Sequence, residues 1–304
     1  MQFLEQVDFL NHNGVFLPML NDVARNQFYD NILPEVRNQN CIEIGFGTGL
    51  LSMLALKHGA RHIVAYESDS TRYQLGQAMI EVLGLQEKIT LLNKTYDHNC
   101  ESDAAVIFTE TVDRNIWGEG LYHSLPRKVN QKFLPGQYFL EIHSVPVTDD
   151  MAMKFLKSQE DYCFTPGVDM DPKFVSFVNL ALSKKYNKPI QFKTQLPIGI
   201  SALPRNQNLL GLTNNNTWAT MYTIDANGGF DDIDQRDLYV ETHNQPVLII
   251  PRAGLQHHGY RMYLDSGHWG MTDYSVVVNQ PYSKVNISHD LHTGKITYTI
   301  KEKQ

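Results

Sequence analysis

The stretch from Cys41 to Gly49 constrains the fold of this chain more than any other part of the sequence. It reads Cys-Ile-Glu-Ile-Gly-Phe-Gly-Thr-Gly, an apolar strand that ends in three alternating glycines, and an apolar helix over Leu50–His58 follows directly. Because Gly45, Gly47 and Gly49 lack a Cβ, backbone N–H groups and the positive end of the helix can approach a ligand closely. The turn predicts a nucleotide-like ligand, and a glycine-rich turn that binds nothing is the alternative.

The spacing of the glycines separates two kinds of nucleotide site. In the dinucleotide fingerprint G-x-G-x-x-G, counted from Gly45, the last glycine would fall on Leu50, and Gly49 comes one residue too early. The pattern present is Glu43-x-Gly45-x-Gly47-x-Gly49, which is similar to the first motif of class I S-adenosylmethionine-dependent methyltransferases. We therefore expect a methyl-donor site here rather than a dinucleotide site.

Apolar strands and helices alternate around the glycine turn, which predicts a parallel sheet with right-handed crossover connections. In such a Rossmann-like α/β fold, helices cover both faces of the sheet and the strands are apolar throughout. The expected helices are 19–32, 50–58 and 70–83, and the expected strands are 41–44, 62–67, 88–93, 104–109 and 136–147.

Carboxylates follow two of the expected strands, at the edge where open α/β sheets bind their ligands. Glu67 lies 18 residues after Gly49, a spacing that suits a carboxylate accepting hydrogen bonds from a ribose diol. Glu110 follows strand 104–109 directly, and Glu119 lies in the same loop, so a hairpin would bring both carboxylates onto one cation. The alternative at each position is a solvated side chain.

A polar pair lies in the first expected helix. Asp22 and Arg25 are separated by one helical turn. From the residues alone, the simplest interpretation is an exposed ion pair worth about a few tenths of a kcal/mol.

The composition is that of an ordinary soluble protein, and 304 residues suit about two domains. The formal net charge of -7 disfavours nucleic-acid binding and polybasic membrane contacts, but it suits a cationic substrate. Cys41, Cys100 and Cys163 lack the spacing of a metal site or a disulfide framework, so we expect neither. Since the sequence has no visible signal peptide and no long apolar run, we expect a cytoplasmic protein.

The composition and the spacing of the strand- and helix-forming runs change near residues 145–150. This predicts a first domain over residues 1–147 and a second over residues 148–304. Short runs of strand-forming residues recur in the second domain, and His292-Thr-Gly-Lys295 has the composition of a hairpin turn. We expect a mainly β, barrel-like domain with a helical insertion. Its expected strands are 247–250, 260–264, 274–278, 285–288 and 296–300, and its expected helices are 151–158 and 171–182.

Together these motifs resemble the protein arginine methyltransferases, a family in which a class I methyltransferase domain is followed by a β-barrel. The resemblance covers Met19 to about Val147, and it begins with Met19-Leu-x-Asp-x-x-Arg-Asn in the first helix. It includes the glycine motif, the ribose acid Glu67, and Glu110 and Glu119 at the separation of the family's double-glutamate loop. The fold and the site would then be those of an arginine N-methyltransferase.

The loop that contains the two glutamates carries a finer resemblance. The pattern Thr-Glu-x-x-Asp-x-x-x-x-Gly-Glu-Gly over residues 109–120 is more similar to the branch that monomethylates arginine than to the dimethylating branch. Farther along, His268-Trp269 resembles the family's Thr-His-Trp loop, with Gly267 in place of the threonine. Phe16 stands where the monomethylating branch tends to carry tyrosine.

The resemblance implies a role for each candidate residue. The enzyme would transfer a methyl group from S-adenosyl-L-methionine to an arginine nitrogen and release S-adenosyl-L-homocysteine. Glu110 and Glu119 would bind and polarise the guanidinium, Asp22 and His268 would disperse its proton, and Trp269 would contact the substrate. The donor would be held by Arg25 at its carboxylate, Glu67 at its ribose, Ser68, Tyr96 and Asp97 at its adenine, and by Phe16, Met19, Glu43, Gly45, Gly47 and Gly49.

The implied partner is an arginine-containing protein or peptide, and a homodimer is compatible with the resemblance because dimers are common in the family. One alternative is methylation of a free guanidino compound or a biosynthetic peptide at the same site. Another is a non-catalytic module that keeps the methyltransferase fold and binds a partner. The glycines and the four glutamates weigh against this module, since a decayed site need not retain all of them.

Overall fold

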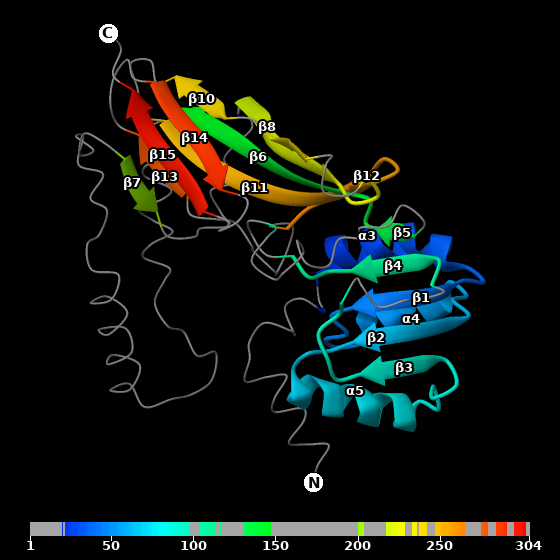
Figure 1. Cartoon of the computed structure of the whole chain (residues 1–304). Helices are drawn as coiled ribbons and strands as arrows, with labels where there is room; N and C mark the ends of the chain where they lie inside the picture. Colours follow the sequence, from blue (N-terminus) through cyan, green and yellow to red (C-terminus); the bar gives the residue numbers. More distant parts are fainter. Residues whose placement is uncertain are drawn as a thin grey trace, which may run out of the picture.

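The computed structural model contains a parallel sheet with its helices at one end and antiparallel strands at the other (Figure 1). The structure describes residues 20, 22–97, 104–112, 116, 131–146, 200–203, 217–228, 233–235, 237–241, 247–264, 275–278, 284–290 and 295–301. The expected helices at 151–158 and 171–182 and the hairpin turn at 292–295 lie largely or wholly outside these residues.

Five parallel strands form the first sheet, in the order β3-β2-β1-β4-β5. From β1 the chain passes outward to β2 and β3 and then returns to the other side of β1, so the switch point of the sheet lies between β1 and β4. This confirms the predicted α/β class. The strands are β1 (Asn40–Ile44), β2 (His62–Tyr66), β3 (Ile89–Leu92), β4 (Val106–Thr109) and β5 (Lys132–Leu134), and the helices are α3 (Val23–Ile32), η1 (Leu33–Val36), α4 (Leu50–Lys57) and α5 (Ser70–Val82).

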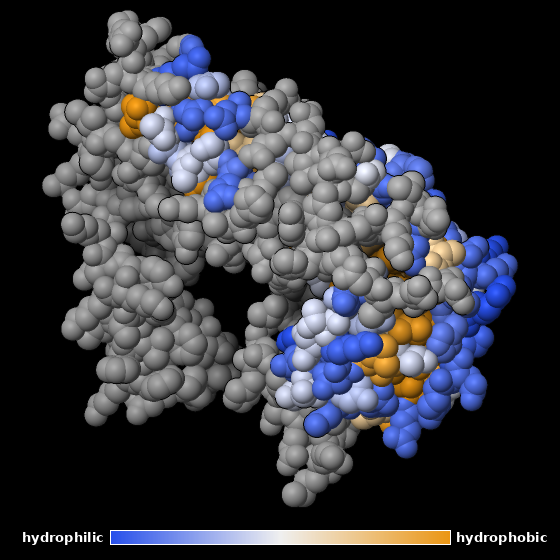
Figure 2. Space-filling model, in the orientation of Figure 1, coloured by the Kyte–Doolittle hydropathy of each residue, from blue (hydrophilic) through white to orange (hydrophobic). Residues whose placement is uncertain are grey.

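Burial of apolar side chains explains why these segments form strands. Every residue of β4 is buried, and so is every residue of β1 after Asn40, which requires cover on both faces of the sheet. Hydrophilic residues cover most of the described surface on the face drawn in Figure 2, and apolar residues gather in a smaller area over this part of the molecule. Among the helices that the structure describes, none is long and apolar enough to cross a membrane.

The carboxyl ends of four strands lie level with one another. Ile44, the last residue of β1, pairs with Tyr66 in β2 and with Thr109 in β4, and Tyr66 pairs with Leu92 in β3. Consequently the residues that follow these strands all leave the sheet at the same edge. This edge carries the glycine turn and two of the acids that the sequence predicts as site residues, Glu67 and Glu110.

Two antiparallel sheets form the other end of the molecule. One has the order β7-β13-β11-β6-β8-β9 with β12 added against β11, and the other has the order β10-β14-β15. The sheets meet where Tyr222 of β8 stacks on His289 of β14, with ring centroids 5.1 Å apart. The described strands pair as two open sheets, so closure into a barrel stays a prediction. The strands are β6 (Gln137–Pro146), β7 (Ile200–Leu203), β8 (Thr217–Asp225), β9 (Ile233–Gln235), β10 (Leu238–Glu241), β11 (Val247–His257), β12 (Tyr260–Tyr263), β13 (Ser275–Val278), β14 (Lys284–Asp290) and β15 (Lys295–Lys301).

β11 extends well beyond the predicted strand 247–250. The prediction ended there because Pro251 lacks an N–H group and normally interrupts a central strand. In the structure Pro251 pairs with Ile142 of β6 on one side, while β13 pairs only with residues 247–249 and β12 only with residues 254–257 on the other. Pro251 therefore lies where β11 has one neighbour, and its missing N–H breaks no ladder bond.

Along the chain, the passage from the parallel sheet to the antiparallel sheets comes before residues 145–150, where the composition changes. β5 ends at Leu134, a cis peptide bond joins Leu134 to Pro135, and β6 begins at Gln137. β6 pairs with β8 and β11 of the antiparallel sheet rather than with β5. The division between domains after residue 147 stays a prediction, but strand 136–147, which it assigns to the first domain, pairs within the second sheet.

A buried histidine links the two parts of the molecule. His257, at the end of β11, accepts the N–H of Gly136 at Nδ1 (3.0 Å) and contacts Glu35 Oε1 through Nε2 (3.0 Å). Glu35 lies in η1 and also pairs with Lys132 of β5 and with His258. Because Glu35 belongs to the helical layer of the parallel sheet, this cluster fixes β11 against that layer.

The stabilising role of His257 can be tested by comparing its substitution with that of the neighbouring His258. Replacing His257 with Ala leaves the buried Gly136 N–H and one side of Glu35 without a partner, so we expect a loss of about 1–3 kcal/mol in the free energy of unfolding. His258 contacts the same carboxylate, but its side chain is 68% exposed. His258→Ala should therefore change the stability by less than about 0.5 kcal/mol. Urea denaturation measures both, and equal effects would contradict the proposed link.

Candidate functional site

The three glycines of the turn after β1 share one backbone conformation. Gly45, Gly47 and Gly49 have φ angles of 79°, 54° and 78°, in the left-handed region that other residues rarely adopt. The N–H groups of Gly45 and Phe46 both donate to the Tyr66 carbonyl at 3.0 and 2.9 Å, which ties the turn to β2. The remaining turn and the N-terminus of α4 are thus held at the edge of the sheet.

The turn also lies against the loop that follows β4. A Cβ placed on Gly45 would come within 2.7 Å of Thr111 Cγ2, a distance that real contacts do not reach. Thr111 directly follows Glu110. Gly45 is therefore needed for two reasons, its positive φ and its close approach to the loop that carries the first of the two paired glutamates.

Glu67 lies at the end of β2, as predicted, and its carboxylate already has protein partners. Oε2 accepts the N–H of Gly47 at 3.0 Å, and Oε1 accepts the N–H of Asp69 at 2.9 Å and contacts Arg72 Nε at 3.2 Å. A carboxylate has about four lone-pair sites, so roughly one remains for a ligand hydroxyl while Arg72 stays in place. The solvated alternative is wrong, because Glu67 is only 4% exposed.

Arg72 is a site residue that the sequence reasoning missed. It lies in the first turn of α5, five residues after Glu67. That position was a usable signal, since the first turn of a helix that follows a parallel strand lies beside the end of that strand. A ligand that takes both oxygens of Glu67 would have to displace the Arg72 side chain, which is 32% exposed.

Glu43 is a buried carboxyl group near the carboxyl end of β1. Its Oε2 accepts a short hydrogen bond from the Ser52 hydroxyl in α4, while its Oε1 is buried with no hydrogen-bond partner. The pKa of Glu43 is raised to about 8, mainly by burial and also by the nearby charge of Glu67, while the Ser52 hydrogen bond partly opposes these effects. Glu43 is therefore mostly protonated at neutral pH in this structure, and a cationic group beside its unpartnered oxygen would favour ionisation.

Helix α3 begins at a buried cap. Asp22 is the N-cap, and its Oδ1 accepts the backbone N–H of Arg25 at 3.1 Å. Asp22 is 2% exposed and Arg25 is 3% exposed. An exposed ion pair is therefore the wrong interpretation of these two residues, and the side chain of Arg25 is directed elsewhere.

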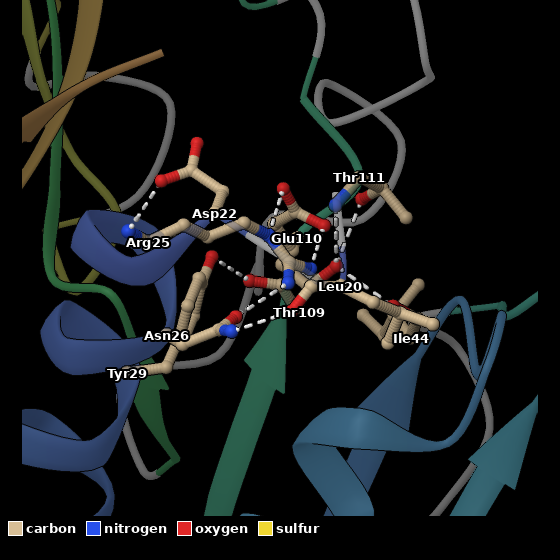
Figure 3. A network of polar contacts seen from close by, with 9 residues as sticks. All are labelled: Leu20, Asp22, Arg25, Asn26, Tyr29, Ile44, Thr109, Glu110 and Thr111. Carbon is tan, nitrogen blue, oxygen red and sulfur yellow. Dashed lines mark hydrogen bonds and ion pairs between the residues drawn. The ribbon is translucent and has the colours of Figure 1, made fainter. Parts of the chain in front are cut away.

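The Arg25 side chain binds Glu110 through both carboxylate oxygens (Figure 3). Nε donates to Oε1 at 2.7 Å, and Nη2 forms a second, short contact with Oε2. Burial disfavours the charge of Arg25, but the charge and hydrogen bonds of Glu110 outweigh this effect and raise its pKa. A bidentate pair of this geometry is among the strongest polar contacts in proteins. Nothing in the sequence indicated that these two residues meet.

The backbone of the Glu110 loop is fixed by α3 and β1. Tyr29 of α3 donates its hydroxyl to the carbonyl of Thr109 at 2.9 Å, and the Thr109 hydroxyl donates to the Ile44 carbonyl at 2.8 Å (Figure 3). Thr109 Oγ1 also accepts the N–H of Thr111 at 3.1 Å. These bonds hold the residues on either side of Glu110, so the position of its carboxylate is set by its own side-chain torsions.

A second tyrosine lies close to the same carboxylate. Tyr138 of β6 is fully buried, and its hydroxyl has no hydrogen-bond partner. Burial raises the pKa of Tyr138 well above its usual value, and the charge of Glu110 raises it further. The register explains the proximity, because Phe108 of β4 pairs with Leu134 of β5, four residues before Tyr138.

The residues expected around adenine follow β2 and β3. Tyr96 is buried and packs edge-on against Tyr66, with ring centroids 5.2 Å apart. Ser68 and Asp97 are exposed at the same edge of the sheet. Phe16, Met19, Glu119, His268 and Trp269 lie outside the described residues, so their predicted places in the site stay predictions.

The histidine cluster at the junction meets a distance criterion for a metal site, since ligand atoms of Glu35, His257 and His258 lie within 4.8 Å of one another. The hydrogen bonds argue against this use. His257 Nδ1 accepts the Gly136 N–H, so the neutral ring carries its proton on Nε2 and donates it to Glu35. A metal would need that Nε2 lone pair, and Lys132 already places a cation on Glu35.

Comparison with known proteins agrees with this geometry. No family model matches the sequence. Protein arginine N-methyltransferase 9 of Mus musculus is 34% identical over 115 residues, which cover 35% of this chain and 14% of the mouse protein. Protein arginine N-methyltransferase 1 of Saccharomyces cerevisiae is 34% identical over 86 residues, 27% of this chain and 24% of the yeast protein. The matched stretch is thus a small part of these relatives.

Solved structures extend the likeness to the whole fold. The crystal structure of Arabidopsis thaliana protein arginine methyltransferase 10 covers 94% of this chain, and 92% of that protein is covered in turn, with a TM-score of 0.57 and 15% identity. The structure of PRMT6 with SAH covers 96% of this chain and is itself covered completely, with a TM-score of 0.59 and 15% identity. The chain therefore has the fold of protein arginine methyltransferases, and part of its sequence is related to theirs.

The raised pKa of Glu43 predicts a pH-dependent stability. The carboxyl group titrates near its usual pKa of about 4.3 in the unfolded chain and at about 8 in the folded one, so the folded state binds more protons between these values. Glu43 should therefore lower the free energy of unfolding as the pH rises through this window, by about 5 kcal/mol in total. Urea denaturation at several pH values measures the effect.

The matched variant is Glu43→Gln, which keeps the shape of the side chain and an acceptor for Ser52. It should be more stable than the wild type at about pH 8.5 and similar to it at about pH 5. If the difference between the two proteins does not change with pH, Glu43 is not the buried proton-binding group described above.

Proposed function

We propose that this chain transfers a methyl group from S-adenosylmethionine to a guanidino nitrogen of arginine in a protein or peptide. The observation that carries the proposal is the contact between Gly45 and the loop of Glu110, which brings a methyl-donor turn against a carboxylate that can bind a guanidinium. The relatives supply the reaction class, since each is an arginine N-methyltransferase by name.

The donor would fit the polar groups at the carboxyl edge of the sheet. Glu43 Oε1, buried and without a partner, suits the ammonium of the methionine portion, which would favour the ionised carboxylate. Glu67 would accept a ribose hydroxyl at its remaining lone pair, and Arg25 would bind the donor carboxylate with its guanidinium. When bound, S-adenosylmethionine supplies the methyl group on its sulfonium, which becomes the thioether of S-adenosylhomocysteine.

The acceptor is a difficult nucleophile, because the guanidinium is protonated below a pKa of about 12 and its charge is delocalised. Glu110 and Glu119 would bind it by charge-assisted hydrogen bonds, draw its positive charge toward the bound nitrogens and fix its plane against the methyl group. Holding the nitrogen in line with the methyl group accounts for a further part of the rate. As the new N–C bond forms, the nitrogen carries an excess proton.

Disposal of that proton is assigned to Asp22 and His268. Asp22 would orient the imidazole, and the imidazole would take the proton after transfer. In the structure one oxygen of the Asp22 carboxylate caps α3, and its other oxygen would accept the histidine N–H in this proposal. We also infer that the product is monomethylarginine, which mass spectrometry of the digested product would distinguish from dimethylarginine.

The rival functions give different results in the same assays. A free guanidino compound as the acceptor would be methylated while arginine peptides are not. A non-catalytic module would methylate neither, and titration calorimetry would detect no binding of S-adenosylhomocysteine. A homodimer stays a prediction for this chain, and the heterotetramer of the Trypanosoma brucei PRMT1 enzyme and its prozyme is one assembly in a protein of this fold.

The decisive variant for the proposed function is Glu110→Gln. It keeps the size of the side chain but removes the charge that binds the guanidinium, so methyl transfer to an arginine-rich peptide should fall by about 10²–10³-fold. Binding of S-adenosylhomocysteine should not weaken, since Glu110 is assigned to the acceptor. Labelled donor and scintillation counting measure the first effect, and calorimetry measures the second.

Glu81→Gln is the matched control, because Glu81 is an exposed glutamate of α5. It should leave both the rate and the donor affinity unchanged. If Glu110→Gln methylates the peptide at the wild-type rate, Glu110 does not bind the acceptor and the assignment is wrong.

A further inference from the structure

The ion pair between Arg25 and Glu110 occupies groups that the two substrates would need. Both oxygens of Glu110 contact the Nε/Nη2 edge of one guanidinium, and the side chains are 4% and 10% exposed. The partner of Glu110 in the structure is thus an arginine of the chain itself. It has the same chemistry as the acceptor of the proposed reaction.

A second guanidinium on the same carboxylate would meet two obstacles. Both oxygens of Glu110 already accept hydrogen bonds from Arg25, so the acceptor would have to use the remaining lone pairs of the carboxylate. In addition, Arg25 and the acceptor would bring two positive charges together in a largely buried site, where water screens them poorly. Binding of the acceptor is therefore disfavoured while Arg25 stays on Glu110.

A carboxylate beside Arg25 would remove both obstacles. Among the described residues, the second edge of the Arg25 guanidinium makes one long contact, 3.4 Å from Nη1 to Asn26 Oδ1. A ligand carboxylate on this edge would neutralise the charge of the guanidinium, which weakens its attraction to Glu110, and would draw the side chain toward the ligand. The donor of the proposed reaction carries such a carboxylate on its amino-acid portion.

The surrounding backbone is fixed, so an exchange of partners involves side chains alone. Asp22 caps the helix at the Arg25 N–H, and Tyr29 holds the Thr109 carbonyl next to Glu110. The Arg25 guanidinium also lies 5.6 Å from the centroid of the Tyr29 ring, which stabilises it by a cation–π interaction. The Tyr138 hydroxyl is buried without a hydrogen-bond partner, and the charge of Glu110 raises the pKa of this tyrosine.

We propose that the Arg25–Glu110 ion pair is an internal lock on the acceptor site, which the carboxylate of the methyl donor opens by taking Arg25 from Glu110. This inference rests on the proposed function, and it adds an order to it: the donor binds first and the acceptor arginine second. No covalent step is involved. The lock prevents an arginine side chain from filling the site before a methyl group is present.

The experiment measures how the donor changes the affinity for an acceptor. The probe is a fluorescently labelled arginine-rich peptide that the methylation assay has identified as an acceptor, and its affinity is measured by anisotropy. With S-adenosylhomocysteine present, the peptide should bind about 10- to 100-fold more tightly than without it, a usual range for coupled sites. By linkage, the peptide should tighten S-adenosylhomocysteine binding by the same factor.

A second nucleoside separates the lock from general ordering of the site. 5′-Methylthioadenosine has the adenosine and the thioether of the product but lacks the amino-acid carboxylate. At a concentration that saturates the protein, it should leave the peptide affinity unchanged. If it raises the affinity as much as S-adenosylhomocysteine does, filling the nucleoside site is sufficient and the lock is wrong.

Variants of the pair give an independent result. Arg25→Gln removes the internal guanidinium, so the peptide should bind without any donor about as tightly as it binds the wild type with S-adenosylhomocysteine. Lys57→Gln is the control, because it removes the cation of an exposed ion pair with Asp30 and should retain the coupling. If Arg25→Gln does not raise the donor-free peptide affinity, Arg25 does not obstruct the acceptor.

The two proposals can fail separately. If no arginine peptide is methylated, the proposed function fails and the lock fails with it. If a peptide is methylated but binds equally tightly with and without S-adenosylhomocysteine, the function stands and only the lock is overturned.

Discussion

The ion pair between Arg25 and Glu110 joins the two halves of the candidate site. It connects the first turn of α3 to the end of β4, across 85 residues of sequence. Removing either partner of such a pair leaves a buried charge and typically costs about 3–5 kcal/mol, whereas an apolar pair of similar size would often be no less stable. Its presence is therefore better explained by a role in the site than by a contribution to stability.

Three carboxyl groups at one edge of the sheet differ in what surrounds them. Glu43 is buried with one oxygen unpartnered, and burial raises its pKa to about 8. Glu67 is held by two backbone N–H groups and Arg72, and Glu110 is held by Arg25. These environments suit different partners: an ammonium for Glu43, a hydroxyl for Glu67 and a guanidinium for Glu110.

The parallel sheet and the edge that carries the site follow from local patterns in the sequence. The strands are apolar runs between turns, and the positive φ angles of Gly45, Gly47 and Gly49 agree with their predicted turn. The short strand β5 and the strands β7 to β10 were missed, because three or four residues, or a mixture such as Thr-Trp-Ala-Thr-Met-Tyr, give no clear period. The predicted strand for β11 ended before Pro251, since only the pairing pattern reveals that this proline has one neighbouring strand.

Pairings between distant residues could not be predicted in the same way. Two separate sequence motifs predicted Arg25 and Glu110 as site residues. Their contact, however, depends on how α3 packs against the end of β4. The same holds for Tyr29 on the Thr109 carbonyl and for His257 on Glu35, since neither pair has a sequence spacing that indicates contact. These contacts arise from tertiary packing, and they distinguish the site in this chain from a list of motif residues.

The most direct test of this account is a crystal structure of the protein with S-adenosylhomocysteine bound. The account predicts that the Arg25 guanidinium contacts the carboxylate of the ligand, that Glu110 has left the Nε/Nη2 edge of Arg25, and that the Glu43 carboxylate lies beside the ligand ammonium. A structure in which Arg25 keeps both contacts with Glu110 while the ligand is fully bound would contradict it.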